Sequence, residues 1–301
     1  MSHFHASRLT WPGEIFPEAS SRTGSQSPFL IKPFLDKMTY SEVHAVMVGG
    51  FATIAGGVLA AYIGMGISPT HLIVASVMSA PAALVMAKLL VPETEHSETA
   101  GDAKLPKIQA GENLVDAAAR GTTDGLKLAV NVMAMLIAFI ALIALVDWVL
   151  GGIDAKVDGQ WFGGEAFAVG AGTEYKGWFP GSLRTIFGTV FAPLAWVMGV
   201  PWREAANVGN LLGTKICVNE FVAYAELSKM MGSGELSERS IVIATYALCG
   251  FANFSSVGIQ IGGISAIAPS RRTDLARLGI RAMFGGAFAS WMTATIAGLL
   301  L

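Results

Sequence analysis

The stretch GTKICVNEFVAY, residues 213–224, places Lys215, Asn219 and Glu220 inside a chain that is otherwise mostly apolar. A glycine and a threonine precede the lysine, so the backbone there can bend. An ionisable side chain at membrane depth is costly and usually faces a cavity, an ion path or a substrate. These residues alone leave two interpretations open: a polar tip buried at membrane depth, or a short polar loop between two helices at the membrane surface.

Two further stretches favour the buried tip. GFANFSS, residues 250–256, interrupts one long apolar segment, and GFATI, residues 50–54, interrupts another. Each interruption lies downstream of a shorter polar-tipped segment, GSQSPF at 24–29 in the first case and NEF at 219–221 in the second. Paired broken hydrophobic segments in the two halves of a chain are the best sequence pointer to a transporter binding site.

Composition indicates a membrane protein. The 301 residues are 53% hydrophobic and only 14% charged, whereas soluble domains are about a quarter charged. A net charge of −2 gives no indication of nucleic-acid binding. Cys217 and Cys249 lie in apolar segments and form neither a disulfide framework nor a zinc spacing. The sequence contains no HExxH or GxSxG motif, so we expect no enzyme activity.

We therefore expect an all-α membrane protein. Residues 1–22 have no apolar core of signal-peptide length and are predicted to form an irregular tail; the glycine-rich residues 151–180 are predicted to form an aqueous loop. The remaining predicted segments are a hairpin arm at 24–38, a broken helix at 42–66, a span at 71–91, an interfacial helix at 112–127, a span at 128–150, a second interfacial helix at 183–200, a second hairpin at 202–230, a second broken helix at 240–267 and a final span at 277–301.

Positive charge predicts the orientation, because lysine and arginine concentrate in cytoplasmic loops. The arginine-rich residues 271–281, Lys37 and the loop with Lys104 and Lys107 then lie inside, and the C-terminus lies outside. With this orientation the first hairpin enters the membrane from inside and the second from outside. The predicted fold is an inverted repeat of re-entrant hairpin, broken helix and spanning helix.

Residues 213–224 resemble the C-terminal signature of the concentrative nucleoside transporters, a glycine and a lysine followed by Asn-Glu-Phe-Val-Ala-Tyr. Residues 247–256 are similar to the family's next helix, and the likeness covers nearly everything after Gly24. It implies a multi-pass protein that transports nucleosides across the inner or plasma membrane by cation-coupled alternating access. It also implies that the protein lies in the lipid bilayer as a homotrimer. The family's N-terminal helices and part of its first hairpin have no counterpart in the chain.

The resemblance assigns ribose binding to Glu220, Asn253 and Ser256. A carboxylate can accept two hydroxyl protons, and residues three apart on a helix, as Asn253 and Ser256 are, share a face. We expect an aqueous pocket at membrane depth around Glu220, bounded by the other two residues. Lys215, five positions earlier, either offsets the carboxylate charge or points to the surface.

The resemblance also assigns a base-binding tip and a cation site. Gly24, Ser25 and Gln26 match the base-reading tip, where the family has Gln-Thr-Glu; Ser25 keeps a hydroxyl, and Gln26 replaces a carboxylate with an amide. Thr53 and Ile54 match the helix part of a sodium site. Sodium is the expected coupling ion, a proton is the alternative, and no cofactor is expected besides the coupling ion.

A second interpretation of function stays open. A truncated or degenerate paralogue could bind nucleosides or membrane partners without transporting them. The missing N-terminal helices and the altered tip at Gly24 to Gln26 favour it, whereas the retained Glu220, Asn253 and Ser256 oppose it.

Overall fold

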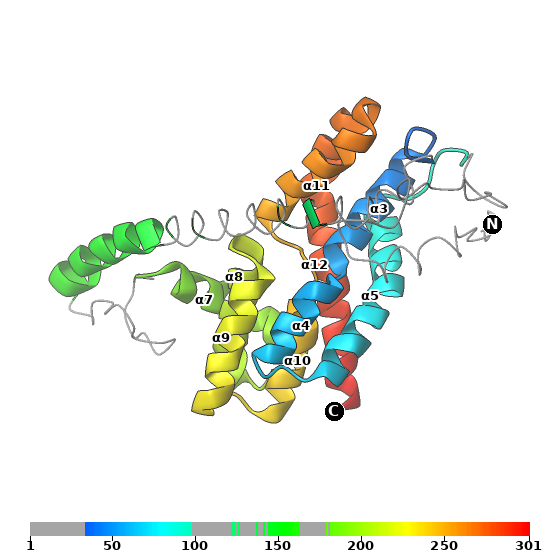
Figure 1. Cartoon of the computed structure of the whole chain (residues 1–301). Coiled ribbons are helices and arrows are strands. Elements are labelled where there is room, and N and C mark those ends of the chain that lie inside the picture. Colours follow the sequence, from blue (N-terminus) through cyan, green and yellow to red (C-terminus); the bar gives the residue numbers. More distant parts are fainter. Residues whose placement is uncertain are drawn as a thin grey trace, which may run out of the picture.

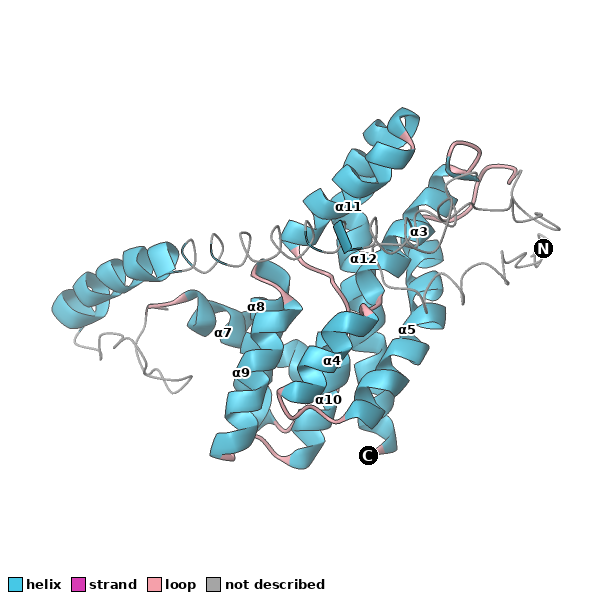
Figure 2. Ribbon diagram, viewed as in Figure 1, coloured by secondary structure: helices cyan, strands magenta, loops and turns pink. Residues whose placement is uncertain are grey.

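The structure is a computed structural model that describes residues 34–97, 144–162 and 181–301, together with residues 122, 123, 126, 137, 141 and 179. Every regular element in this part of the chain is a helix (Figure 2). The named elements are α3 (Tyr40–Ala52), α4 (Gly56–Gly64), α5 (Pro69–Leu90), η1 (Val157–Phe162), α7 (Leu183–Val197), α8 (Trp202–Cys217), α9 (Glu220–Ser233), α10 (Glu238–Leu248), α11 (Phe254–Ile267), η2 (Pro269–Arg271) and α12 (Arg272–Leu300).

Among the described residues, three helical segments are long and apolar enough to cross a membrane: Tyr40–Gly64, Pro69–Leu90 and Pro269–Leu300. A fourth candidate consists of α7 and α8 together, which are bent by 117° at the connection between them. A span needs about 20 apolar residues, and these lengths meet that requirement. The chain therefore has the helices of a multi-pass membrane protein.

Helix α12 is the centre of the packing. It lies against α3, α5, α10 and α11, and it runs through the middle of the molecule to the C-terminus (Figure 1). Small residues make this close approach feasible: a Cβ added at Gly286 would lie only 2.4 Å from Phe51 Cβ of α3. Small residues at helix contacts are typical of membrane proteins, where van der Waals packing replaces the hydrophobic effect between helices.

Two helices are broken, and their breaks lie against each other. The first break separates α3 from α4 at residues 53–55, and the second separates α10 from α11 at residues 249–253. Gly250 in the second break has a φ of +105°, and a Cβ there would lie 2.7 Å from the carbonyl oxygens of Phe51 and Ala52. Only glycine fits this backbone conformation and this contact.

Helices α8 and α9 form a hairpin whose tip is Val218 and Asn219. The far ends of the two helices meet, because Glu204 Oε2 near the start of α8 accepts hydrogen bonds from Ser237 N at 2.9 Å and Ser237 Oγ at 2.8 Å, just after α9. The hairpin packs on α7 through glycine, since a Cβ at Gly209 would lie 2.8 Å from the backbone nitrogen of Ala192. This arrangement presents the hairpin tip to the second helix break.

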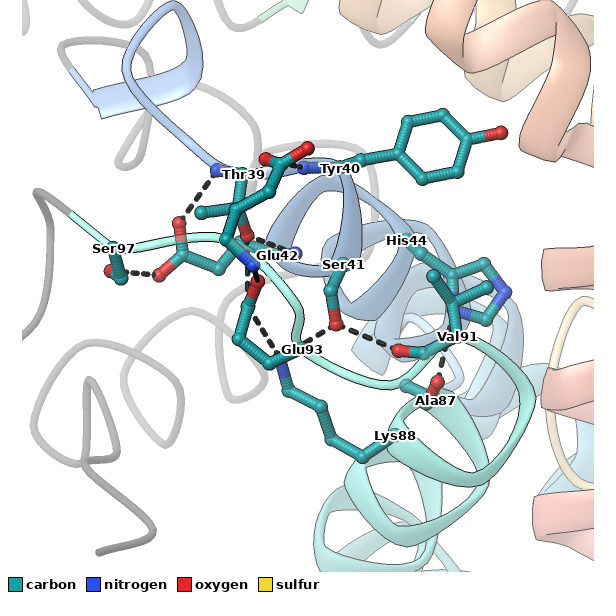
Figure 3. Close-up of polar contacts among 11 residues, drawn as sticks. Thr39, Tyr40, Ser41, Glu42, His44, Ala87, Lys88, Val91, Glu93 and Ser97 are labelled. Carbon is teal, nitrogen blue, oxygen red and sulfur yellow. Dashed lines mark hydrogen bonds and ion pairs between the residues drawn. The ribbon is translucent and has the colours of Figure 1, made fainter. Parts of the chain in front are cut away.

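At one end of the molecule a polar network joins the start of α3 to the end of α5 (Figure 3). Lys88 Nζ donates to Ser41 Oγ at 2.8 Å and pairs with Glu93 Oε2 at 3.1 Å, and Thr39 Oγ1 donates to the same carboxylate at 2.8 Å. Burial alone disfavours the charged form of Glu93, but these donors outweigh it and hold the pKa of the carboxyl below its usual range. The network fixes where α3 enters the helix bundle.

Two predicted boundaries are wrong. The helix expected to end at 150 continues to 156 and then into η1, where the aqueous loop was predicted. Gly151 and Gly152 weaken a helix by about 1 kcal/mol each without having to end it. Asp158 in η1 is buried and accepts a hydrogen bond from Phe179 N at 3.0 Å. The final helix begins at Arg272 rather than 277, beside an ion pair of Arg271 with Asp274 at 3.1 Å.

Other predicted segments fall wholly or mostly outside the described residues: the tail at 1–22, most of the hairpin arm at 24–38, and most of 112–150. The remaining ranges correspond to named helices. The first broken helix is α3 with α4, the second hairpin is α8 with α9, and the second broken helix is α10 with α11.

Candidate functional site

Glu220 is the first residue of α9 and lies at the tip of the α8–α9 hairpin. The preceding residue, Asn219, caps the helix by accepting a hydrogen bond from Val222 N at 2.9 Å. An acidic residue in the first turn is favoured by the partial positive charge of a helix N-terminus. The Glu220 side chain is 4% exposed, so this charge lies inside the protein.

Asn253 meets Glu220 from the second helix break. It is the N-cap of α11, where its Oδ1 accepts hydrogen bonds from Ser256 N at 2.8 Å and Ser255 Oγ at 2.7 Å. A backbone N–H is only a donor, so this contact fixes the orientation of the amide. The amide nitrogen Nδ2 therefore faces the carboxylate and donates to Glu220 Oε2 at 3.0 Å.

Tyr62 is a member of this site that the sequence analysis missed. This residue of α4 is fully buried, and its hydroxyl donates to Glu220 Oε1 at 3.4 Å. Its ring lies 4.2 Å from the ring of Tyr224, whose own hydroxyl donates to Thr245 O at 2.7 Å. A tyrosine within the apolar second half of a broken helix was the signal available in the sequence, because a buried phenol needs a polar partner.

The expected aqueous pocket around Glu220 stays a prediction, and the structure shows which side chains contact the carboxylate. Both carboxylate oxygens receive hydrogen bonds from the protein itself, one from Asn253 and one from Tyr62. A buried charge must be compensated, and here two side chains supply hydrogen-bond donors. Part of the site is thus filled by the chain's own groups.

Lys215 does not point to the surface. Its side chain has no exposed area, and Nζ donates to Ala247 O at 2.9 Å, Cys249 O at 3.1 Å and Ser290 Oγ at 3.3 Å. Two of these acceptors are backbone carbonyls at the end of α10. The ammonium therefore binds the beginning of the second helix break, whereas Asn253 lies at the end of that break.

The structure brings some of the predicted residues together and leaves others outside its description. Glu220 and Asn253 are in direct contact, and Ser256 lies one helical turn beyond Asn253 with 8% of its surface exposed. The tip residues Gly24, Ser25 and Gln26 lie outside the described residues.

The predicted cation ligands lie at the first break. Thr53 and Ile54 are buried, and Thr53 Oγ1 donates to Gly49 O at 2.9 Å. Within the described ranges no group of three or more His, Cys, Asp and Glu side chains could hold a metal ion. Any ion at the first break therefore depends on hydroxyl and carbonyl oxygens, which are the ligands that hard cations take.

The geometry gives one chemical capability. A buried carboxylate with two hydrogen-bond donors can exchange them for the hydroxyl groups of a ligand, without covalent chemistry. Such a centre, placed where broken helices meet in a multi-pass helical bundle, defines an integral membrane protein of the transporter class.

Comparison with known proteins supplies the family. The family model described as "Na+ dependent nucleoside transporter C-terminus" matches residues 71–298. The chain belongs to this family of concentrative nucleoside transporters. A solved structure of CNTnw in an inward-facing substrate-bound state aligns with a TM-score of 0.81 and 42% identity over 95% of this chain and 63% of that one. A CNTnw variant in an outward-facing state aligns almost equally well, with a TM-score of 0.80.

Curated relatives are transporters rather than enzymes. An uncharacterized transporter of Haemophilus influenzae is 45% identical over 92% of this chain and 63% of its own length. Sodium/nucleoside cotransporter 1 of Mus musculus is 41% identical over 97% of this chain and 44% of its own length. The chain thus spans less than two thirds of the length of either relative.

Proposed function

We propose that the chain is the substrate-binding and transporting part of a cation-coupled nucleoside transporter. One observation carries the proposal: the buried Glu220 carboxylate at the hairpin tip is bonded to the Asn253 amide at the second helix break, 3.0 Å away. A polar contact between two irregular segments inside an apolar bundle is a place where a hydroxylated substrate can bind and where helices can move. The names of the curated relatives add support.

Ribose is the part of the substrate that this site fits. Its 2′ and 3′ hydroxyls are donors, and Glu220 accepts them once the Tyr62 hydroxyl gives way. That hydroxyl is the weaker of the two present donors, since its 3.4 Å distance is long for an O–H···O hydrogen bond. Asn253 and Ser256 then complete the set of ribose partners. A site built on such contacts rejects analogues that lack the hydroxyls, because its buried polar groups stay unpaired.

The base is read by the first hairpin tip in this proposal. Gly24, Ser25 and Gln26 take this role from their match to the family's tip. Gln26 both donates and accepts hydrogen bonds, so it suits the edges of more than one base. Gly24 offers no side chain, which leaves Ser25 and Gln26 as the side chains that choose between bases.

Sodium is the proposed coupling ion. The family description and the names of curated relatives both contain sodium. Thr53 and Ile54 at the first break would contribute oxygens to it, together with the first hairpin. A proton remains the alternative coupling ion.

Alternating access through an inverted repeat is the proposed mechanism. The α8–α9 hairpin supports a re-entrant element, because its two far ends meet at the contact of Glu204 with Ser237 while its tip reaches the second break. Residues 24–38 would be its counterpart in the first half. We propose that the protein is a homotrimer in the cell membrane, either an inner or a plasma membrane.

Uptake of labelled uridine into proteoliposomes tests the function. We expect an imposed sodium gradient to drive accumulation that is abolished when the gradient is collapsed. Accumulation driven by a pH gradient alone would show that the coupling ion is a proton rather than sodium. Uridine binding without uptake under either gradient would favour the non-transporting paralogue, and absence of nucleoside binding would overturn the proposal.

A further inference from the structure

Lys215 is a buried cation whose three ammonium protons all have partners. Its Nζ lies 2.9 Å from Ala247 O, 3.1 Å from Cys249 O and 3.3 Å from Ser290 Oγ, and its side chain has no exposed area. An ammonium group has three donors and no acceptor, so these contacts use its full capacity. Removing one partner of a buried charge is costly, because the group that is left has nothing to compensate it.

The partners of Lys215 are the groups that the helix break leaves exposed. The last four carbonyls of a helix have no intrahelical donor, and they carry the partial negative charge of the helix dipole. Ala247 O and Cys249 O belong to this end of α10. The Lys215 ammonium therefore supplies both the missing donors and the opposite charge, inside a bundle where water is not available to do so.

The same contacts connect the two residues of the proposed ribose site. Lys215 precedes Glu220 by five residues on the hairpin, and Cys249 precedes Asn253 by four residues in the break. Ser290 of α12 adds a fixed point, because its Oγ also donates to Cys249 O at 2.5 Å. The hairpin, the break and the central helix are thus tied at one ammonium group.

We propose that Lys215 is a positioning residue for ribose recognition. By holding the end of α10 against the hairpin, its ammonium sets the 3.0 Å approach of Asn253 to Glu220. This inference rests on the proposed function, since it assigns the residue that builds the ribose site. Without the ammonium the second break shifts. The contact between Asn253 and Glu220 is then lost although the protein still folds.

The test compares Lys215→Met with wild type in the full chain, solubilised in detergent. Methionine keeps a similar length without the charge. The readout is hydroxyl discrimination, defined as the Kd of 2′,3′-dideoxyuridine divided by the Kd of uridine. We expect the substitution to lower this ratio about tenfold through weaker uridine binding, with the Kd of dideoxyuridine changed less than twofold. Lys215→Arg, which keeps the charge, should restore part of the ratio.

Glu204→Gln is the matched control. It removes a buried charge at the other end of the same helix and weakens the hydrogen bonds from Ser237, which then go to a neutral amide oxygen. We expect it to lower the unfolding midpoint while leaving hydroxyl discrimination within twofold of wild type. An equal loss of discrimination in Glu204→Gln would reduce the role of Lys215 to general stability and overturn the inference.

Ser290→Ala covers the case in which Lys215→Met does not fold, because it removes one ammonium partner and keeps the charge. We expect it to lower discrimination about threefold; an unchanged ratio in either folded variant contradicts the positioning role. Measurements on wild type distinguish failure of the Lys215 inference from failure of the proposed function. A wild type that does not discriminate refutes the ribose site, whereas a discriminating wild type with an unaffected Lys215→Met refutes only the inference.

Discussion

The two helix breaks touch each other but are built in opposite ways. The second break is held by side chains: Asn253 caps α11, Lys215 binds the end of α10, and Gly250 makes the turn. The first break has none of these devices in the described structure. Ala55 makes no side-chain cap for α4, and the hydroxyl of Thr53 turns back to Gly49 O of its own helix.

This difference suggests a division of labour. The second break is preorganised by the chain's own residues; it carries Asn253 and faces Glu220, which are two of the proposed ribose ligands. The first break has no side-chain cap at the start of α4, and at the end of α3 the Thr53 hydroxyl donates to Gly49 O; this break carries the proposed cation ligands. Preorganised donors favour specific recognition of a substrate, whereas a break without its own caps has more to gain from an added ion.

Gly250→Ala should give the largest effect and tests whether the second break is the rigid one. The residue would adopt a φ of +105° and would press its Cβ against two backbone oxygens at 2.7 Å. We expect a loss of about 3 kcal/mol in the free energy of unfolding. Gly56→Ala beside the first break is the control, because a Cβ there meets nothing within 4 Å and should change stability by less than about 1 kcal/mol. Similar unfolding midpoints for both variants would contradict the comparison.

Asn253→Ala and Thr53→Val should separate the two breaks by ligand. Removing the amide costs the helix cap, about 1 kcal/mol, and a donor to a charged group, about 1.5–3 kcal/mol, so we expect uridine binding to weaken about tenfold or more. Thr53→Val should instead raise the sodium concentration needed for binding and leave hydroxyl discrimination unchanged at saturating sodium. Titrations of uridine at several sodium concentrations measure both. Interchanged phenotypes would mean that the roles of the breaks are reversed.

Glu93→Gln should have the smallest effect, because it acts at the end of the first half and away from both breaks. The folded pKa of Glu93 is lowered, so its contribution to stability is present above the unfolded pKa of about 4.3 and is lost as the pH falls through the folded pKa. The variant should therefore lose less stability than wild type between pH 5 and pH 3. Unfolding midpoints across this pH range measure the loss of stability, with the exposed Glu238→Gln as control. If Glu93→Gln loses stability with pH as steeply as wild type does, the Glu93 network does not contribute to stability.

Much of this organisation could be predicted from residues that repeat. The two Gly-Phe-Ala interruptions predicted two breaks, and the polar residues beside them singled out Glu220 and Asn253, whose proposed ribose-binding role came from the family resemblance. The contact of Tyr62 with Glu220 could not be predicted, because it joins residues 158 positions apart. The helix past 150 was missed since glycine weakens helices on average but does not end one whose polar groups find partners, as Asp158 does in η1.

Lys215 shows a further limit of sequence patterns. A lysine five residues before a glutamate suggested that it offsets the carboxylate charge or points to the surface. Its hydrogen-bond partners are backbone carbonyls at the end of α10 and a serine of α12. Backbone acceptors have no sequence signature, so only the folded arrangement of the break could identify them.

The most direct test of the account is ligand binding by Glu220→Gln, which keeps the size of the side chain and removes its charge. Wild type and variant are titrated with uridine, 2′,3′-dideoxyuridine and uracil, and folding is checked by the unfolding midpoint. We predict that the variant loses uridine affinity about tenfold to a hundredfold while uracil and dideoxyuridine change little. If wild type binds all three alike, or if the folded variant loses all three equally, Glu220 does not read the ribose and the proposed site is wrong.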